Sequence, residues 1–402
     1  MSEWKKYKLS EIATLSNGIN FDKSAYTSGV KLIGVADFKD RIYPDYESLQ
    51  EVDSKVVRSG DYLEKGDIVF VRSNGNKELV GRCMMIDREI PVTYSGFCIK
   101  LHLIDKNLFE PVYFNYLFRT KQFRKAMTGT AVGANIQNLS QARLGNCEVN
   151  IPEIETQIRI ATILSRYDTL IENYQKQIKL LEEAAQRLYK EWFVDLRFPG
   201  HENTKMVDGL PEGWEKKKIN TFVNLQSGYA FKSSTFEEEG IYKIVTIKNV
   251  KDGVFDGENT SLIRQIPDKM PKHCRLKTGD ILLSLTGNVG RICMVVGDDY
   301  LLNQRVAKLE TRNPAFTYCL FRNNDMFITV NNLANGAAQQ NVSPIRIGEL
   351  KVLFANDSIT NQFENLVGTI CNKIINMYAQ IRLLTEARDR LLPRLMGGEM
   401  EV

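Results

Sequence analysis

Two carboxylates and a lysine that would suit a metal-dependent nuclease stand close together in the sequence, in Pro44-Asp45 and Asp53-Ser54-Lys55. Such an enzyme needs clustered carboxylates beside the phosphate that it cleaves. The segment between them is polar, shows no buried strand and has no counterpart in the second half of the chain. We therefore predict a loop here rather than a catalytic centre.

Other catalytic and cofactor-binding motifs are absent from the amino-acid sequence. There is no G-x-x-x-x-G-K-[ST] phosphate loop and no G-x-G-x-x-G stretch after a strand. An amino-methyltransferase would carry an Asn-Pro-Pro-aromatic loop, but Asn313-Pro314-Ala315-Phe316 lacks the second proline and is interpreted as a helix cap. Three scattered histidines and seven irregularly spaced cysteines give no triad, zinc site or disulfide framework. We expect a chain that binds no metal or cofactor and catalyses no reaction itself.

Polar loops next to glycines are the remaining candidates for function. They follow predicted strands at equivalent places in both halves, as in Arg72-Ser73-Asn74-Gly75-Asn76 and Thr286-Gly287-Asn288. Their side chains are the donors and acceptors that read base edges and hold phosphates. The net charge of +4 is too small to indicate nucleic-acid binding by itself. Recurrence of the loops with different side chains favours two modules that read two different short sequences.

The elements that carry these loops repeat along the chain, with a shift between 203 and 213 positions. Each half reads as a Gly-Asp turn feeding a strand, a hairpin loop with its return strand, a helix opened by proline, a flexible loop and a last strand. The proline-opened helices are predicted over 113–127 and 316–333. The sequence therefore predicts a tandem duplication of an α/β (α+β) module.

A long helix follows each module. From Ile160 to Trp192, and again from Phe363 to Leu395, apolar residues recur in steps of four and three, which is typical of a coiled-coil seam. A helix of roughly 39 residues would be about 58 Å long. Arg388 alone interrupts the apolar pattern, and it is expected to pair across the two helices or to face a partner. The predicted seam includes Leu164, Tyr167, Ile171, Tyr174, Ile178, Leu181, Leu188, Ile370, Ile374, Met377, Ile381, Leu384 and Leu391. The alternative is a pair of ordinary amphipathic helices in two globular cores.

The domain plan follows from the repeat. With 402 residues and 43% hydrophobic composition, the chain can form several cores. We predict modules at 1–152 and 214–355, long helices at 153–198 and 356–402 that bury their apolar stripes against each other, and a linker at 199–213. One polypeptide would then carry an approximate two-fold axis. A polar start and the lack of an apolar run of membrane-spanning length favour a cytoplasmic protein.

At this point the chain resembles the specificity subunits of type I restriction-modification systems over nearly all of its length. The stretches that carry the resemblance are Ser227-Gly228-Tyr229-Ala230-Phe231-Lys232-Ser233, Thr278-Gly279-Asp280, Thr286-Gly287-Asn288-Val289-Gly290-Arg291, Leu302-Asn303-Gln304-Arg305-Val306, Glu191-Trp192-Phe193-Val194-Asp195-Leu196-Arg197-Phe198-Pro199-Gly200, Leu210-Pro211-Glu212-Gly213-Trp214-Glu215 and Leu391-Leu392-Pro393-Arg394-Leu395-Met396 with Gly398-Glu399. The first module is the looser match.

The resemblance implies two target-recognition domains that are held apart by an antiparallel coiled coil of the two long helices. Each domain would read one half of a split site on double-stranded DNA, and the helix pair would set the gap. It also implies two methyltransferase subunits that carry S-adenosylmethionine and modify adenine, and optional restriction subunits that use ATP and Mg²⁺. Candidate DNA contacts are Lys23, Arg72, Asn74, Asn76, Arg82, Asn135 and Gln137 in the first module, and Tyr229, Lys232, Thr286, Asn288, Arg291, Gln339, Gln340 and Asn341 in the second. Lysines and arginines would hold phosphates and amides would read bases, while core packing is the alternative for Tyr229 and Phe231.

Two other classes of function are weighed against this interpretation. A stand-alone nuclease, or the recognition end of a fused restriction enzyme, would cut DNA with Mg²⁺ alone. A scaffolding coiled-coil protein would show no site preference and no dependence of binding on salt.

Overall fold

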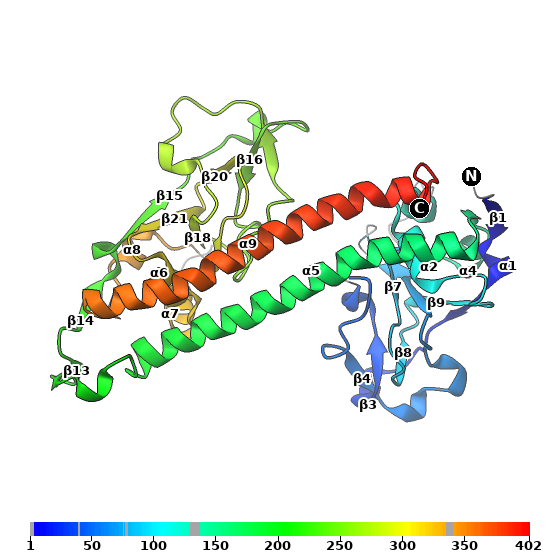
Figure 1. The fold of residues 1–402 in the computed structure, drawn as a ribbon, viewed down its shortest axis with the longest axis horizontal. Coiled ribbons are helices and arrows are strands. Elements are labelled where there is room, and N and C mark those ends of the chain that lie inside the picture. The colour runs from blue at the N-terminus through cyan, green and yellow to red at the C-terminus, as the bar shows by residue number, and fades with distance from the viewer. Residues whose placement is uncertain (1–3, 39–40, 75, 77–78, 129–136, 335–340) are drawn as a thin grey trace. The chain divides into compact units, whose positions relative to one another are not determined.

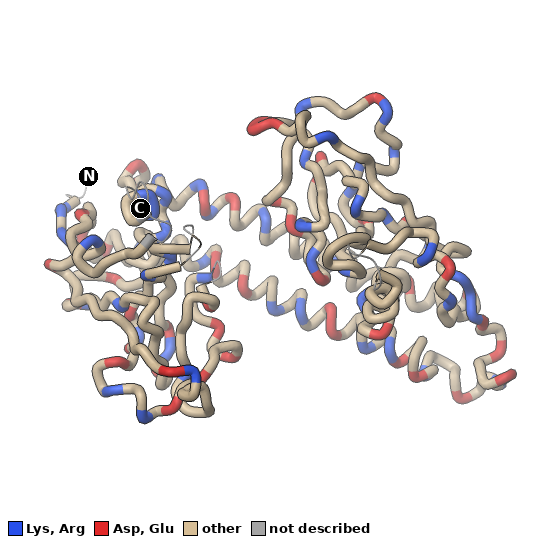
Figure 2. The backbone as a smooth tube through the Cα atoms, turned by 180° about the vertical axis from the view of Figure 1, so that it is seen from behind, with Lys and Arg blue, Asp and Glu red and all other residues tan. Residues whose placement is uncertain are grey.

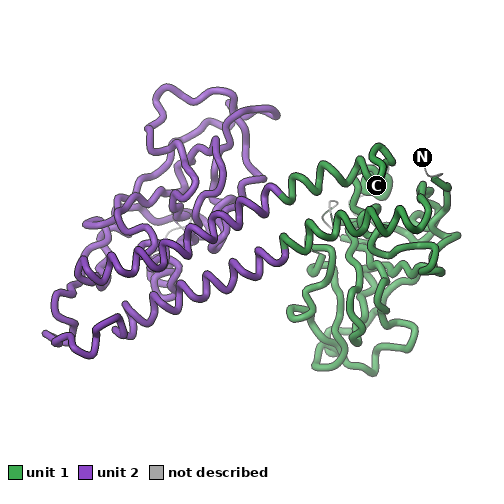
Figure 3. The backbone as a smooth tube through the Cα atoms, in the orientation of Figure 1, with its two compact units in different colours: residues 1–171, 384–402 green, residues 172–383 purple. Residues whose placement is uncertain are grey.

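The computed structural model describes residues 4–38, 41–74, 76, 79–128, 137–334 and 341–402 (Figure 1). Basic and acidic residues alternate along both long helices (Figure 2), in keeping with 53 lysines and arginines against 49 aspartates and glutamates. The chain divides into two compact units (Figure 3): unit 1 is residues 1–171 with 384–402, and unit 2 is residues 172–383. Each unit therefore holds one globular module and a segment of both long helices, α5 (Ile154–Tyr189) and α9 (Asp357–Met396).

Unit 1 contains two principal sheets and a two-stranded ribbon. The first sheet has the order β2 (Ala13–Asn17), β9 (Cys98–Leu103), β5 (Ile68–Val71), β7 (Cys83–Met85), and the second has the order β4 (Gln50–Val52), β3 (Tyr26–Ile33), β8 (Val92–Tyr94). The ribbon pairs β1 (Lys5–Lys8) with β11 (Glu148–Ile151). The helices before α5 are α1 (Leu9–Ile12), α2 (Pro111–Arg119), α3 (Lys121–Thr128) and α4 (Gln141–Gly145).

Unit 2 repeats this topology. Its sheets have the orders β15 (Val223–Ser227), β21 (Val306–Thr311), β18 (Ile281–Ser284), β19 (Ile292–Met294) and β17 (Ser261–Ile263), β16 (Tyr242–Val245), β20 (Tyr300–Leu302), and its ribbon pairs β14 (Glu215–Lys218) with β22 (Lys351–Phe354). The helices are α6 (Pro314–Arg322), α7 (Asn324–Ala334) and α8 (Pro344–Gly348), and β12 (Met206–Val207) pairs with β13 (Leu210–Pro211) in the linker. The tandem repeat and the mixed α/β class predicted from the sequence are confirmed.

The central strand of each module feeds two cores. In β5, Ile68 and Phe70 pack with the helices while Val69 and Val71 pack toward the second sheet, and all four are fully buried. Successive side chains of a strand point to opposite faces, so a strand covered on both faces must be apolar at every position. In β18, Leu282 likewise lies in a different core from its neighbours Ile281 and Leu283.

A glycine-aspartate turn starts each central strand. Gly66 and Gly279 have φ angles of 95° and 92°, which a residue with a Cβ adopts only under strain. The carboxylates of Asp67 and Asp280 each accept a hydrogen bond of 2.8 Å from the main-chain N–H three residues earlier. The hairpins that follow, β5 with β7 and β18 with β19, are antiparallel. The predicted turns and hairpins are therefore confirmed.

The proline-opened helices are shorter than predicted. The expected helix 113–127 is split into α2 and α3 by Thr120, whose ψ of 144° is extended, and the expected helix 316–333 is split into α6 and α7 by Asn323, with ψ of 135°. Each residue caps the helix that follows it. Thr120 Oγ1 accepts a bond of 3.2 Å from Phe123 N, and Asn323 Oδ1 accepts one of 2.9 Å from Asp325 N.

The segment 44–55 also differs from the prediction, because it contains a strand with a counterpart in unit 2. Val52 of β4 is fully buried, and β4 pairs with β3 as β17 pairs with β16. With three residues, β4 is too short for its alternation to be seen in the sequence. The carboxylate of Asp53 caps the following turn through Lys55 N at 2.9 Å, and Asp45 forms an ion pair of 2.9 Å with Arg41. Both carboxylates have structural roles.

The two long helices run in opposite directions within each unit. In unit 2 the rings of Tyr189 and Trp192 lie 6.3 and 5.6 Å from the ring of Phe363, so the end of α5 packs on the start of α9. In unit 1 Leu164, near the start of α5, shares a core with Leu395, near the end of α9. The predicted helix end at Trp192 falls in a π-helical turn, Lys190–Val194, that continues α5.

The residues of the predicted seam are all buried or half-buried, whereas leucines that lie off the seam, such as Leu180 and Leu383, are 65% and 51% exposed.

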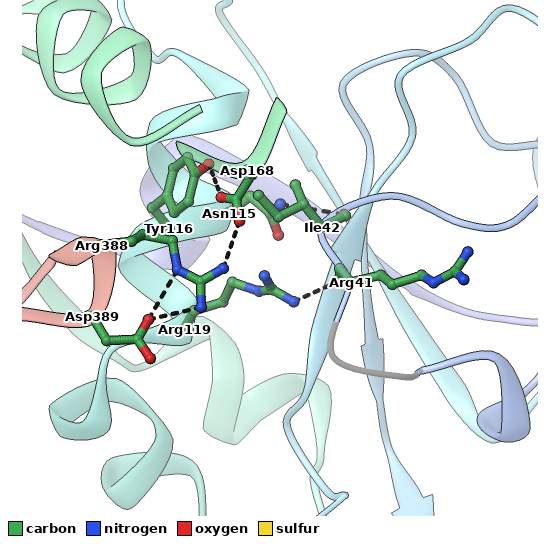
Figure 4. Close-up of polar contacts among 8 residues, drawn as sticks. All are labelled: Arg41, Ile42, Asn115, Tyr116, Arg119, Asp168, Arg388 and Asp389. Atoms are coloured by element: carbon green, nitrogen blue, oxygen red, sulfur yellow. Dashed lines mark hydrogen bonds and ion pairs between the residues drawn. The ribbon is translucent and has the colours of Figure 1, made fainter. Parts of the chain in front are cut away.

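The exception in the seam, Arg388, pairs with a buried carboxylate (Figure 4). Its guanidinium lies 2.5 Å from Asp168 of α5, and the hydroxyl of Tyr116 of α2 donates to the other carboxylate oxygen. Burial lowers the pKa of Arg388, but the charges of Asp168 and Asp389 and the hydrogen bonds to them together outweigh burial, and the net shift is upward. Burial, followed by the Asp168 charge, raises the pKa of Tyr116 well above its usual value. The three side chains form a polar cluster in unit 1, here called the Asp168 triad.

Unit 2 has no charge at the positions that match the Asp168 triad. A shift of 203 positions aligns Tyr116 with Cys319, and Asp168 with Cys371. The same shift aligns Arg388 of α9 with Ala185 of α5. Cys319, Cys371 and Ala185 are 0%, 6% and 1% exposed, and the thiol of Cys319 lies 4.0 Å from the carbonyl of Ala185. The equivalent positions of the repeat are thus filled by a buried ion pair in unit 1 and by small apolar side chains in unit 2.

Candidate nucleic-acid interface

Main-chain hydrogen bonds hold four segments of unit 1 together where β5 ends. Arg72 N donates to Phe97 O over 2.8 Å, and Leu139 N donates to Arg72 O over 2.8 Å. Ile19 N donates to Tyr94 O over 2.9 Å, and Gly96 N returns a bond to Ile19 O. The segments 18–19, 72–74, 94–97 and 137–139 therefore form one frame, which is named here the loop frame.

Unit 2 builds the same loop frame at the end of β18. Leu285 N donates to Arg305 O over 3.0 Å, and Val342 N donates to Leu285 O over 2.9 Å. Tyr229 N donates to Leu302 O over 2.9 Å, and Gln304 N returns a bond of 3.0 Å to Tyr229 O. The bonds match one for one, which makes Leu285 the counterpart of Arg72, and Arg305 the counterpart of Phe97.

A glycine allows the first segment of each frame to come close to the third. A Cβ on Gly18 would lie 2.3 Å from the carbonyl oxygens of Tyr94 and Ser95, and a Cβ on Gly228 would lie 2.4 Å from main-chain atoms of Asn303. Real Cβ atoms do not approach backbone so closely, so only glycine fits at these two positions. The glycines of Asn17-Gly18 and Ser227-Gly228 are thus geometric requirements of the frame.

Several candidate residues lie in or next to the loop frame. Strand β6 (Ser73–Asn74) pairs with β10 (Gln137–Asn138), which places Asn74 opposite Gln137. In unit 2 Thr286 forms a bridge with Asn341, and its hydroxyl lies 3.0 Å from the side-chain oxygen of Asn341. The structure thus brings together the loop after the central strand and the loop before the short helix, α4 or α8.

Arg82 and Arg291 lie at the return strand of each hairpin, where their carbonyls accept from Val71 N at 2.8 Å and Ser284 N at 2.9 Å. Both arginines are half-buried. The exposed Asn76 donates its N–H to Asn74 Oδ1 over 2.7 Å, and the carbonyl of the exposed Asn288 accepts from the hydroxyl of Ser284.

The two candidate lysines are exposed but are not equivalent. Lys23 begins the 3₁₀ turn Lys23–Ala25, whereas Lys232 precedes the matching turn Ser233–Thr235. The ring of Tyr229 is half-buried and lies edge-on to Phe231 at 5.1 Å, and both rings pack against cores of unit 2. Asn135, Gln339 and Gln340 lie outside the described residues.

Sequence reasoning missed four positions of the loop frame: Asn138, Phe97, Gln304 and Arg305, all of which are exposed. For Asn138 a signal existed. The serines that cap α4 and α8, Ser140 and Ser343, are 203 positions apart, and that shift aligns Asn138 with Asn341. Phe97 precedes β9, and Gln304 and Arg305 precede β21, two strands that were not predicted. Only the hydrogen bonds of the frame identify the place of these residues.

The described part of the chain contains no group of three or more histidine, cysteine, aspartate or glutamate residues that could hold a metal ion. Among the described helices none is long and apolar enough to cross a membrane. The seven cysteines are free thiols; Cys147 is half-buried and the others are buried. Burial raises the pKa of Cys98 to about 12.

A family model described as the type I restriction modification DNA specificity domain matches residues 1–183 and 211–357. The chain belongs to this family. The two matches coincide with the two copies of the repeat, so each loop frame belongs to a DNA specificity domain, which is a recognition domain and not a catalytic one. The protein is accordingly a type I specificity subunit.

Relatives of known role extend over much or all of the chain. It is 28% identical over 323 residues to the specificity subunit of the type I restriction enzyme MjaIX of Methanocaldococcus jannaschii, a match that covers 75% of this chain and 72% of the relative. It is 22% identical to the specificity subunit of the HindI enzyme of Haemophilus influenzae over the full length of both. The fold is similar to that of the S subunit of the type I system of M. genitalium, with a TM-score of 0.63, 17% identity, and coverage of 98% of this chain and 96% of the other.

Proposed function

We propose that this specificity subunit reads a bipartite site on double-stranded DNA, with one module for each half-site, and that it directs adenine methylation and restriction by partner subunits. The observation that carries the proposal is the loop frame. Both units form it with the same main-chain hydrogen bonds, but its side chains differ between the two units. A backbone frame that is repeated in both units but carries different polar side chains suits direct reading of base edges. Two unlike frames in one chain would give an asymmetric site.

The long helices would form an antiparallel coiled coil that relates the two modules by an approximate two-fold axis and fixes the gap between the half-sites. Support comes from the burial of the predicted seam and from the opposite directions of α5 and α9 within each unit. The predicted bounds, with modules at 1–152 and 214–355 and helices at 153–198 and 356–402, are retained in this proposal.

The partners in this proposal are two methyltransferase subunits, which carry S-adenosylmethionine, and, where present, two restriction subunits, which use ATP and Mg²⁺. The chain itself would supply recognition and geometry only, and it would work in the cytoplasm where its DNA is found. Arginine and lysine side chains near the frame would hold phosphates, and the asparagines and glutamines would read bases.

The test is a binding titration of the chain in complex with its methyltransferase. Affinity for duplex DNA should fall steeply as salt rises, because phosphate contacts release counterions, and one sequence should be preferred over random competitor. Binding that ignores salt and sequence would support a scaffold instead. Cleavage of DNA by the purified chain with Mg²⁺ alone would indicate a nuclease and contradict the proposal.

A further inference from the structure

One position of the loop frame differs in chemical character between the two units. It is occupied by Phe97 in unit 1 and by Arg305 in unit 2, and in each case its carbonyl accepts a hydrogen bond from the residue that directly follows the central strand. The ring of Phe97 is 62% exposed, which is unusual for a phenylalanine, and Arg305 is exposed as well. Neither side chain is needed to build the frame, since the frame uses only main-chain atoms of these residues.

The position that donates this hydrogen bond shows the opposite change, from arginine in unit 1 to an apolar residue in unit 2. In unit 1, Arg72 is half-buried, and its guanidinium donates to the carbonyl of Gly96 over 3.4 Å, next to Phe97. In unit 2 the counterpart, Leu285, is 3% exposed and lies in the core. Each frame therefore holds one arginine and one apolar residue at this pair of positions, but the arginine comes from a different segment in each.

We propose that residues 97 and 305 are equivalent base-reading positions, at which Phe97 selects thymine through its C5-methyl group and Arg305 selects guanine through its O6 and N7 atoms. This inference rests on the proposed function. It adds the identity of one base in each half-site and names the residue that reads it. An exposed phenyl ring can contact the thymine methyl in the major groove, and a guanidinium matches the two guanine acceptors.

The strands that follow these residues offer matched controls. Phe97 precedes β9 and Ile104 follows it, and Ile104 is an apolar residue of similar exposure, 57%. Arg305 precedes β21 and the exposed Arg312 follows it. Substitution of Ile104 or Arg312 by alanine therefore removes an equivalent side chain from the opposite end of the same strand.

The experiment maps the methylated motif for the full chain co-expressed with its methyltransferase, as wild type and as Phe97→Ala, Arg305→Ala, Ile104→Ala and Arg312→Ala. Phe97→Ala should relax one thymine in one half-site by about four-fold, the value of one buried methyl group. Arg305→Ala should relax one guanine in the other half-site by about ten-fold or more, the value of a bidentate pair. The two control variants should keep the wild-type motif.

Binding to modified DNA tests the atoms involved. Deoxyuridine in place of that thymine should weaken wild-type binding about four-fold, the value of one buried methyl group, and should not affect Phe97→Ala. Deoxy-7-deazaguanosine, which lacks N7, in place of that guanine should weaken DNA binding by the wild type and should not affect binding by Arg305→Ala.

Unchanged motifs for Phe97→Ala and Arg305→Ala would overturn the inference while the proposed function stands, provided that the wild type gives a split motif. A uniform loss on all sequences would assign Arg305 to phosphate, and loss of the methyltransferase from Phe97→Ala would assign the ring to a protein contact; either result would overturn it. No split motif from the wild type would instead contradict the proposed function.

Discussion

Removing Asp168 alone should destabilise unit 1 more than replacing the whole Asp168 triad by uncharged side chains of similar size. In Asp168→Ala the charge of Arg388, whose side chain is only 17% exposed, keeps Asp389 as a partner at 2.7 Å but loses its buried one. Breaking a buried ion pair typically costs 3 to 5 kcal/mol, and partial compensation by the exposed Asp389 lowers the expectation to about 3 kcal/mol. The hydroxyl of Tyr116 also loses its acceptor.

Unit 2 shows that uncharged side chains can occupy the three equivalent positions, where it has cysteine, cysteine and alanine. Those residues are smaller than the members of the Asp168 triad, so the rescue uses uncharged side chains of similar volume. The triple variant Tyr116→Phe, Asp168→Leu, Arg388→Met removes both charges together, and such a replacement of a buried ion pair is often neutral or stabilising. Imperfect packing of the new side chains sets a cost of about 1 kcal/mol. The triple variant should therefore be more stable than Asp168→Ala alone.

Hydrogen exchange of the full chain, followed by mass spectrometry, measures both units in one sample. Peptides from 154–171 and 384–396 should exchange about a hundred-fold faster in Asp168→Ala, since 1.4 kcal/mol corresponds to ten-fold. Peptides from the module of unit 2 serve as the internal control. A change of less than about three-fold in Asp168→Ala, or a triple variant less protected than the single one, would refute the reasoning.

Further predictions follow from burial, close packing and helix length. Cys147 should react with a thiol reagent at pH 8 before the buried thiols. The free energy of unfolding should fall as pH rises from about 9 toward 12, because the raised pKa of a thiol such as Cys98 lets the unfolded chain ionise first. A urea midpoint that is flat over this pH range would contradict the second prediction. Gly18→Ala and Gly228→Ala should each cost about 2 kcal/mol or more, while Gly60→Ala, which meets nothing within 4 Å, should have little effect on the unfolding midpoint. Inserting one heptad into each long helix should lengthen the gap of the methylated motif and keep both half-sites; an unchanged gap would show that the helices do not set it.

The sequence contains most of the fold because its signals are local. The Gly-Asp turns at Gly66 and Gly279, the proline-opened helices and the heptad steps each follow from neighbouring residues, and the repeat adds an independent second copy of every signal. The splits at Thr120 and Asn323 were missed because apolar periodicity continues across a single extended residue.

Long-range pairings could not be predicted in the same way. Arg388 was recognised as an exception, but its partner Asp168 lies 220 positions away and carries no pattern of its own. Phe97 was missed because its place depends on a main-chain hydrogen bond with Arg72. Such a bond does not depend on the type of either residue, so the sequence gives no sign of it. Recurrence identified the two polar loops of each module, but their placement next to one another was not predicted. The bridge between Thr286 and Asn341 shows it in unit 2.

The central claim is that two unlike loop frames read two half-sites. The most direct measurement is to co-express the full chain with its methyltransferase in a host free of adenine methylation and to map modified adenines across the genome by single-molecule sequencing. The account predicts one split, asymmetric motif with a fixed gap. A stable complex that methylates nothing, or that methylates a continuous motif without a gap, would contradict it.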